Sequence, residues 1–237
     1  ANRWLTANAV VGLYPAQRVG DDIVLYADET RQQQVMTWYG LRQQTEKPTR
    51  DDVRNPNRCL ADYVADQTQA ADYVGLFAVT AGLGAEKQEK RFIAAHDDYS
   101  AILFKALADR LAEAFAECMH HRVRTDLWGY AADEALTNED LIKEKYQGIR
   151  PAPGYPACPD HSAKQDMFTL LQCDDIDMGL TSSLAMTPAA SVSGFYLAHP
   201  DAKYFNVGRI GDDQVQDLAQ RQGVAVKDLE RLLAPNL

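Results

Sequence analysis

The sequence predicts an α+β fold, a mixed and mainly antiparallel twisted sheet flanked by helices in a single domain. Two short segments rich in β-branched and aromatic residues, 9–14 and 22–27, lie on either side of a Gly20-Asp21 turn and predict a strand pair. A near-continuous apolar run at 72–80 is typical of a buried strand. Helical patterns do not alternate regularly with these strands, so a doubly wound sheet of the Rossmann methyltransferase kind is not expected.

The longest expected helix covers 97–123. Acidic residues at its start and basic residues at 120–124 suit the helix dipole. Its large apolar side chains recur every three or four residues and predict one stripe facing the core: Leu103, Leu107, Leu111, Phe115 and Cys118.

The remaining elements follow from local start, stop and turn signals. A capping-box pattern, Thr137 with Asp140, predicts a short exposed helix over 137–146 that ends at Gly148. The polar segment 46–58 contains two prolines and is expected to be a surface loop. Further helices are expected at 162–173, 212–222 and 226–233, and further strands at 191–197 and 203–210.

Charge and composition exclude several kinds of partner. The 237 residues contain 24 Lys plus Arg and 34 Asp plus Glu, a net charge of −10. Such a chain would be repelled by nucleic acid and by anionic membranes, so neither partner is expected. The four cysteines form no C-x-x-C pair, which indicates reduced thiols and a cytoplasmic protein. No metal site is expected, because the neighbouring His120 and His121 would point apart on a helix.

The segment 150–161 (RPAPGYPACPDH) carries the strongest chemical signal. Four of the ten prolines fall within nine residues and predict a stiff, extended loop with few sheet hydrogen bonds. Gly154 permits close approach to the backbone, Arg150 offers a planar fork for a carboxylate or phosphate, and Tyr155 adds a ring and a hydroxyl. The residues alone leave a second interpretation open, a rigid connector between two helices.

This segment resembles the signature of the S-adenosylmethionine-binding, or activation, domain of cobalamin-dependent methionine synthase. Other parts of the chain fit the same family, and the resemblance spans essentially its whole length. The matching segments are 17–23 (QRVGDDI), 105–117 (KALADRLAEAFAE), 146–149 (YQGI), 191–194 (SVSG) and 233–237 (LAPNL).

The resemblance implies that the domain, 1–237, binds S-adenosylmethionine and donates its methyl group to reduced cobalamin. This methyl transfer, with one electron from flavodoxin or a similar reductant, would reactivate an enzyme that methylates homocysteine to methionine. No D-x-H-x-x-G motif is present, so cobalamin is expected to be bound by another module of the same polypeptide. Zinc is implied only in a distant module. The family's N-terminal portion, which carries an acidic donor ligand, is expected to be missing here.

The resemblance also assigns site residues. Arg150 would hold the donor's carboxylate, and the backbones of Ala152 and Gly154 would contact the donor. Tyr155 would lie near the methyl-transfer site. Glu113 would pair with the donor's ammonium group, and Tyr204 and Phe205 would line the site. The work of the site would be positioning, so no catalytic acid, base or nucleophile is expected.

Several alternatives remain open at this stage. Glu113 belongs to an acidic row that is typical of a solvated helix face, and Tyr204 and Phe205 equally fit ordinary strand packing. Gly82 and Gly84 follow a strand and resemble part of a methyltransferase glycine loop, although a third glycine is absent. A non-catalytic docking or regulatory module is the remaining alternative. For a reductant, the basic segment 120–124 is the expected contact.

Overall fold

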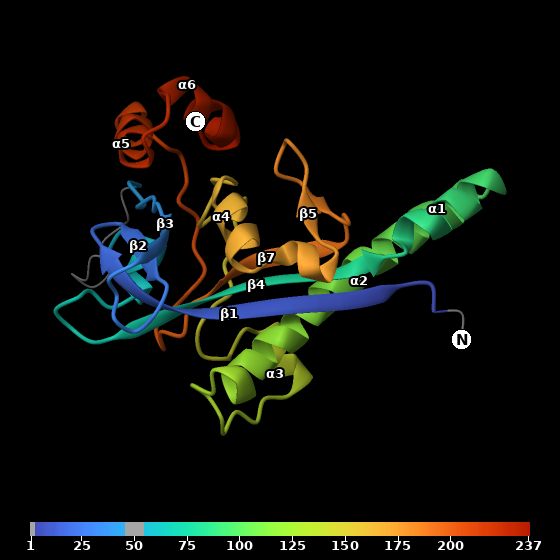
Figure 1. Ribbon diagram of the computed structural model, residues 1–237, viewed down its shortest axis with the longest axis horizontal. Helices are drawn as coiled ribbons and strands as arrows, with labels where there is room; N and C mark the ends of the chain where they lie inside the picture. The colour runs from blue at the N-terminus through green and yellow to red at the C-terminus, as the bar shows by residue number, and fades with distance from the viewer. Residues whose placement is uncertain (1–2, 46–54) are drawn as a thin grey trace. The chain divides into compact units, whose positions relative to one another are not determined.

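A computed structural model describes residues 3–45 and 55–237 (Figure 1). Its main sheet has the strand order β3-β2-β1-β4-β7. The strands are β1 (Thr6–Val19), β2 (Asp22–Tyr26), β3 (Gln34–Trp38), β4 (Asp72–Leu83) and β7 (Ser191–Tyr196). A second, two-stranded sheet pairs β5 (Gly179–Leu180) with β6 (Met186–Thr187). The helices are α1 (Ala85–Ala94), α2 (Asp98–Arg122), α3 (Asn138–Ile142), α4 (Ala163–Leu170), α5 (Asp212–Gln222) and α6 (Val226–Leu233).

The chain divides into two compact units, neither of which is a continuous stretch of sequence. Unit 1 comprises Ala1–Gly12, Leu76–Tyr146 and Lys164–Gly194, and unit 2 comprises Leu13–Gly75, Gln147–Ala163 and Phe195–Leu237. The strands β1, β4 and β7 each contribute residues to both units. The α+β architecture is confirmed, and β2 pairs antiparallel with both β1 and β3.

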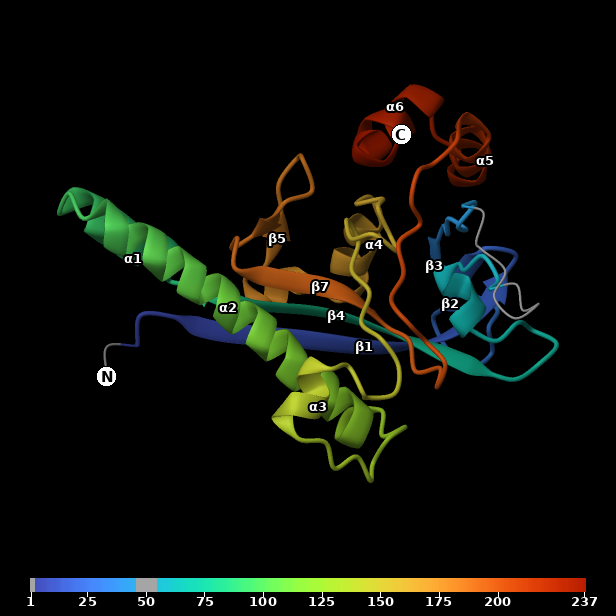
Figure 2. The same cartoon turned by 180° about the vertical axis from the view of Figure 1, so that it is seen from behind.

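The turn between β1 and β2 forms as the sequence predicts. Val19 pairs with Asp22, so Gly20 and Asp21 form a two-residue hairpin loop. Gly20 has a φ of +62°, which a residue with a side chain adopts only at a cost. Beyond the hairpin, β4 lies between β1 and β7 in the strand order, as Figure 2 shows from behind.

The helix α2 in unit 1 packs through its small residues. Its buried face comprises Ala101, Phe104, Ala108, Ala112, Ala116, Met119 and His120. Ala108 and Ala112 form a core cluster with Ala81 of β4 and with Ala190. Side chains this small allow the helix backbone to approach the strands closely.

The predicted apolar stripe of α2 is therefore wrong as a description of its buried face. Leu103, Leu107 and Leu111 are 46%, 53% and 52% exposed, and Cys118 is also exposed. The helix has two apolar faces, one of alanines and one of leucines. Hydrophobic spacing alone does not say which of them the neighbouring strand will cover.

Unit 2 has its own core around α5 and α6. Leu218 and Leu229 from these helices cluster with Leu41 and with Val207 and Ile210 from the preceding segment. Both helices begin and end where the sequence predicts. Gly223 ends α5 with a φ of +68°, the left-handed conformation that favours glycine at this position.

The elements expected at 203–210 and 137–146 differ from the structure. Residues 203–210 do not form a strand, because their backbone groups bond to separate partners. The N–H of Val207 donates to the carbonyl of Pro156, and the N–H of Ile210 donates to that of Asn236. The helix α3 has its expected capping box but ends at Ile142. Of the expected loop at 46–58, residues 46–54 lie outside the described part of the chain.

The four cysteines should differ sharply in reactivity. Burial raises the pKa of both Cys59 and Cys173 to about 12, Cys158 is also buried, and Cys118 is exposed. A raised pKa leaves little of the reactive thiolate at pH 8. We expect iodoacetamide to modify Cys118 of the 237-residue chain first, as peptide mass mapping would show. Equal labelling of Cys59 or Cys173 at the earliest time points would contradict this order, and Cys118→Ser should remove the fast phase.

Across residues 3–45 and 55–237, no helix combines the length and the apolar character needed to cross a membrane.

Candidate functional site

The segment 149–161 in unit 2 forms neither a helix nor a strand of the main sheet, as its prolines predict. Its first residues are nevertheless fixed against the end of β7. Ile149 and Leu197 exchange both backbone hydrogen bonds, at 2.9 and 3.0 Å, and the N–H of Phe195 donates to the carbonyl of Pro151. The loop therefore starts from a defined register.

The tip of the loop is closed by its own backbone. The N–H of Gly154 donates to the carbonyl of Cys158 at 2.7 Å, and the N–H of Cys158 donates to that of Tyr155 at 2.9 Å. The N–H of Tyr155 donates to the carbonyl of Ala152. Three backbone N–H groups of the loop are thus bonded within the loop, which makes the tip rigid.

Gly154 occupies a position that only glycine fits. Its φ is +95°, and a Cβ atom placed there would overlap the imidazole ring of His161. The sequence suggested Gly154 as a point of close approach for a ligand. The structure shows that the close approach includes the loop's own histidine, at the far end of the same motif.

Two residues that sequence reasoning did not connect to the loop, Trp38 and Gln222, support it through hydrogen bonds. The indole N–H of Trp38 donates to the sulfur of Cys158 at 3.1 Å. The side-chain amide of Gln222, at the end of α5, donates to Asp160 at 2.8 Å. The carboxylate of Asp160 also accepts hydrogen bonds from the backbone N–H and from the hydroxyl of Ser162. Cys158 is itself buried.

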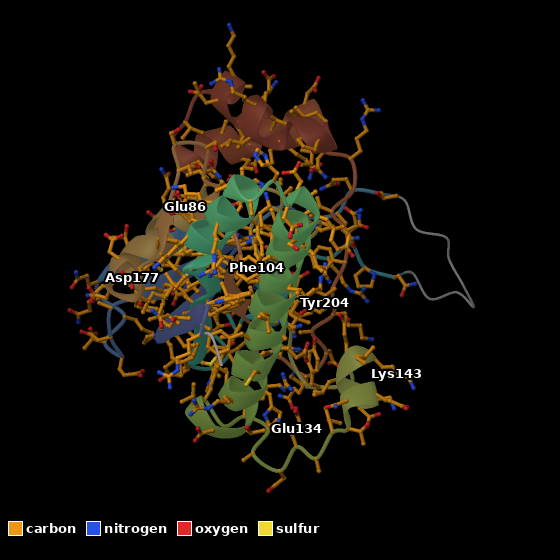
Figure 3. All side chains as sticks on the ribbon, turned by 90° about the vertical axis from the view of Figure 1, so that its right-hand side faces the viewer. Glu86, Phe104, Glu134, Lys143, Asp177 and Tyr204 are labelled. Carbon is orange, nitrogen blue, oxygen red and sulfur yellow. The ribbon has the colours of Figure 1, made fainter. Side chains whose placement is uncertain are left out.

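Tyr204, labelled in Figure 3, is brought to the start of the loop. Its hydroxyl oxygen accepts the backbone N–H of Arg150 at 3.0 Å. Its neighbour Phe205 packs instead against the core cluster of α5 and α6. The residue before Tyr204 is also held: the hydroxyl of Tyr63 donates to the backbone carbonyl of Lys203 at 3.3 Å. Burial raises the pKa of the Tyr63 hydroxyl.

The predicted donor contacts on the loop differ in accessibility. Tyr155 is 57% exposed and Gly154 is exposed, whereas Arg150 is half-buried and Ala152 is buried. An exposed ring, an exposed stretch of backbone and a guanidinium lie within six residues of rigid chain. This set can bind a ligand that combines a flat heterocycle with a carboxylate.

Glu113 lies on α2 in unit 1 and is exposed. The structure therefore places it on a different unit from the loop that carries Arg150, and its pairing with a donor remains a prediction.

The two glycines of the alternative glycine loop have structural roles. A Cβ on Gly82 would crowd Pro188 and Ala190, and Gly84 has a φ of +91° beside the backbone of Trp4. Both residues line a pocket of about 560 Å³ in unit 1, bordered by Glu86 and Asp177. The surrounding antiparallel sheet is not that of a Rossmann methyltransferase, so the glycine-loop alternative is wrong.

The expected basic contact at 120–124 is also corrected by the structure. His120 and Arg124 are buried, and Arg124 forms an ion pair with Glu134. Glu134 and Lys143, both labelled in Figure 3, belong to the segment that follows α2. Within 120–124, only the side chains of His121 and Arg122 are exposed. The sequence placed these residues at the helix end correctly but could not show which side chains turn inward.

Comparison with known proteins agrees with this fold. Residues 1–223 match the family described as vitamin B12 dependent methionine synthase, activation domain. A crystal structure of the MetH reactivation domain bound to AdoHcy is similar, with a TM-score of 0.94 and 55% sequence identity. The similarity covers 99% of this chain and 71% of that chain. The match across nearly the whole sequence shows that this chain belongs to the activation-domain family of vitamin B12-dependent methionine synthases.

Proposed function

We propose that this chain binds S-adenosylmethionine on the loop 150–155 and presents its methyl group to reduced cobalamin. The cobalamin would be held by another module of the same polypeptide. The observation that carries the proposal is the rigid loop. Arg150 is tied to Tyr204 at one end, and Gly154 is closed onto Cys158 at the other. The AdoHcy in the similar crystal structure is the demethylated form of this donor.

The residues of the loop fit such a donor. The Arg150 guanidinium supplies a planar pair of N–H donors for the amino-acid carboxylate, a charge-assisted interaction. The exposed Tyr155 ring and the backbone around Gly154 offer a flat surface for the adenosine portion. Glu113 is proposed as the partner of the ammonium group, and Tyr204 and Phe205 as further residues around the donor.

The contribution of the chain to methyl transfer is orientation. A sulfonium already carries an activated methyl group, and reduced cobalamin supplies the nucleophile. The loop needs only to hold the donor in one pose, and its internal hydrogen bonds remove the freedom that binding would otherwise have to restrict. No proton has to be transferred at Arg150 or Tyr155.

The wider setting follows from the same proposal. The chain would work in the cytoplasm as the reactivating module of a methyltransferase that makes methionine from homocysteine. A flavodoxin or a similar one-electron donor would reduce the cobalamin. Because flavodoxins and this chain are both acidic, their direct contact would have to use local cations such as Arg122.

Arg150→Ala is expected to weaken binding of S-adenosylmethionine and of S-adenosylhomocysteine by about 1.5–3 kcal/mol. This loss corresponds to about a 10-fold to 150-fold rise in Kd. Isothermal titration calorimetry would measure it. Arg231→Ala is the matched control, because Arg231 is an exposed arginine on α6. An unchanged Kd for Arg150→Ala would remove Arg150 from the site.

The same titration separates the proposal from a purely docking or regulatory module. A docking module would bind neither compound, whereas it would still associate with the cobalamin-binding module. Failure of both ligands to bind the parent polypeptide would overturn the proposed function.

A further inference from the structure

Asp160 is a buried carboxylate near the end of the proline-rich loop, and it is bound from two separate segments of unit 2. Its side chain accepts hydrogen bonds from the backbone N–H and the hydroxyl of Ser162, both at 2.7 Å. The side-chain amide of Gln222, the last residue of α5, donates to it at 2.8 Å. A carboxylate is costly to bury unless donors surround it, so these bonds fix Asp160 to the end of α5.

His161 connects this anchor to the tip of the loop. It follows Asp160 directly in the chain, and its imidazole ring lies so close to the backbone of Gly154 that an added Cβ would overlap it. Gly154 is also bonded to Cys158, two residues before Asp160. A displacement of Asp160 would therefore move both groups that hold Gly154 in its conformation.

We propose that Asp160 and Gln222 are positioning residues for the donor, an inference that rests on the proposed function. Neither belongs to the segment 150–155 that is proposed to contact the donor. They act through His161 and the backbone of the loop, which they hold in the binding conformation before the donor arrives. A loop held in this way binds more tightly, because a larger fraction of molecules is competent to bind.

The hydrogen bond of Gln222 is separate from the packing that holds α5 in place. The core cluster of α5 and α6 contains Leu218 and Leu229 but not Gln222, whose side chain is half-buried. Loss of the bond to Asp160 should therefore release the loop while this core stays folded.

In the parent polypeptide, Gln222→Glu is expected to raise the Kd for S-adenosylhomocysteine at pH 8 by at least about 10-fold. Two carboxylates would then face each other where an amide now donates. Isothermal titration calorimetry would measure the Kd and the number of sites, and this number should not change. Fewer sites with an unchanged Kd would show a merely structural role and overturn the proposal. Gln220→Glu is the matched control, since it adds the same charge to the same turn of α5 on an exposed side chain and should leave the Kd unchanged.

Exchanging the donor and the acceptor provides a rescue. When Asp160→Asn is added to Gln222→Glu, the new amide can donate to the new carboxylate. The amide oxygen can still accept the backbone N–H of Ser162. The double variant should return to within about threefold of the original Kd. A Kd as high as that of Gln222→Glu alone would contradict a role for this pair.

A measurement on the unaltered parent decides the question if Gln222→Glu fails to fold. Coupling between two sites is reciprocal, so a donor that is favoured by the anchor must in turn stabilise the end of α5. The N–H groups of Gly223 and Val224 bond to the last turn of α5. Saturation with S-adenosylhomocysteine should slow their hydrogen exchange at least about threefold, while that of Asp228, at the start of α6, stays the same.

The outcomes separate this inference from the proposed function. If the unaltered parent does not bind S-adenosylhomocysteine, the proposed function is wrong and the inference falls with it. If the parent binds but exchange at the end of α5 is unchanged, or if Gln222→Glu binds as tightly as the control, the inference alone is overturned.

Discussion

Replacing Glu134 with leucine is expected to lower the free energy of unfolding by about 3–5 kcal/mol. Arg124 is completely buried, and its Nε and Nη2 atoms each donate to the carboxylate of Glu134 at 2.7 Å. Its guanidinium also covers the ring of Tyr146 at 4.3 Å. Arginine does not lose its proton in proteins, so the variant would bury a charge without a counter-ion. Urea denaturation followed by circular dichroism would measure the loss.

Replacing Arg124 instead of Glu134, and replacing both residues together, test the same ion pair further. Arg124→Met should cost less, because the Glu134 carboxylate that it leaves behind also lies 3.8 Å from His121. Combining Arg124→Met with Glu134→Leu should recover most of the loss, since no unpaired charge remains. Asp126→Asn, which breaks the exposed pair with Arg122, is the control and should change stability by less than about 1 kcal/mol. A Glu134→Leu effect as small as that control would contradict the account.

Replacing Gly154 with alanine is expected to weaken donor binding by about 10-fold to 100-fold. Holding a residue with a side chain at a φ of +95° costs about 1–3 kcal/mol, and the added methyl group would also overlap His161. The loop would therefore leave the conformation that positions Arg150 and Tyr155, and only a fraction of molecules would remain competent to bind. Calorimetric titration with S-adenosylhomocysteine would measure the loss.

Two further variants separate the causes. Gly154→Ala combined with His161→Ala removes the overlap but keeps the backbone strain, so it should recover only part of the affinity. Gly20→Ala, in the loop between β1 and β2, is the control. Its φ is also positive but nothing lies within 4 Å of an added Cβ. It should reduce stability slightly while the Kd stays the same. Wild-type affinity in Gly154→Ala would show that the loop does not need this conformation.

Local signals in the sequence were sufficient for much of the fold. The Gly20-Asp21 turn, the capping box at Thr137 and the glycine after α5 each act over a few residues, and all three signals are found where expected. The strand expected at 203–210 does not form. β propensity does not indicate which hydrogen-bond partners the backbone N–H and C=O groups will have. The prediction of the buried face of α2 was wrong because this helix has two apolar faces. Which of them is buried depends on the strands that pack against the helix.

Local signals in the sequence likewise predicted only part of the candidate site. The proline pattern and Gly154 predicted a rigid loop from its own residues. The supports from Trp38 and Gln222 could not be predicted, because they lie 120 and 62 residues away from their partners Cys158 and Asp160. No periodicity or spacing links residues so far apart, and neither tryptophan nor glutamine is a distinctive ligand.

These distant supports also determine when the loop can take shape during folding. Contacts that close long stretches of chain form late, because their entropy cost must be met first. A ribosome that has just added Asp160 must add 62 more residues before Gln222 can reach it. During synthesis, residues 149–161 are therefore complete well before they are held in place. If the loop binds the donor as proposed, this ability would be acquired at the end of folding, once α5 has docked.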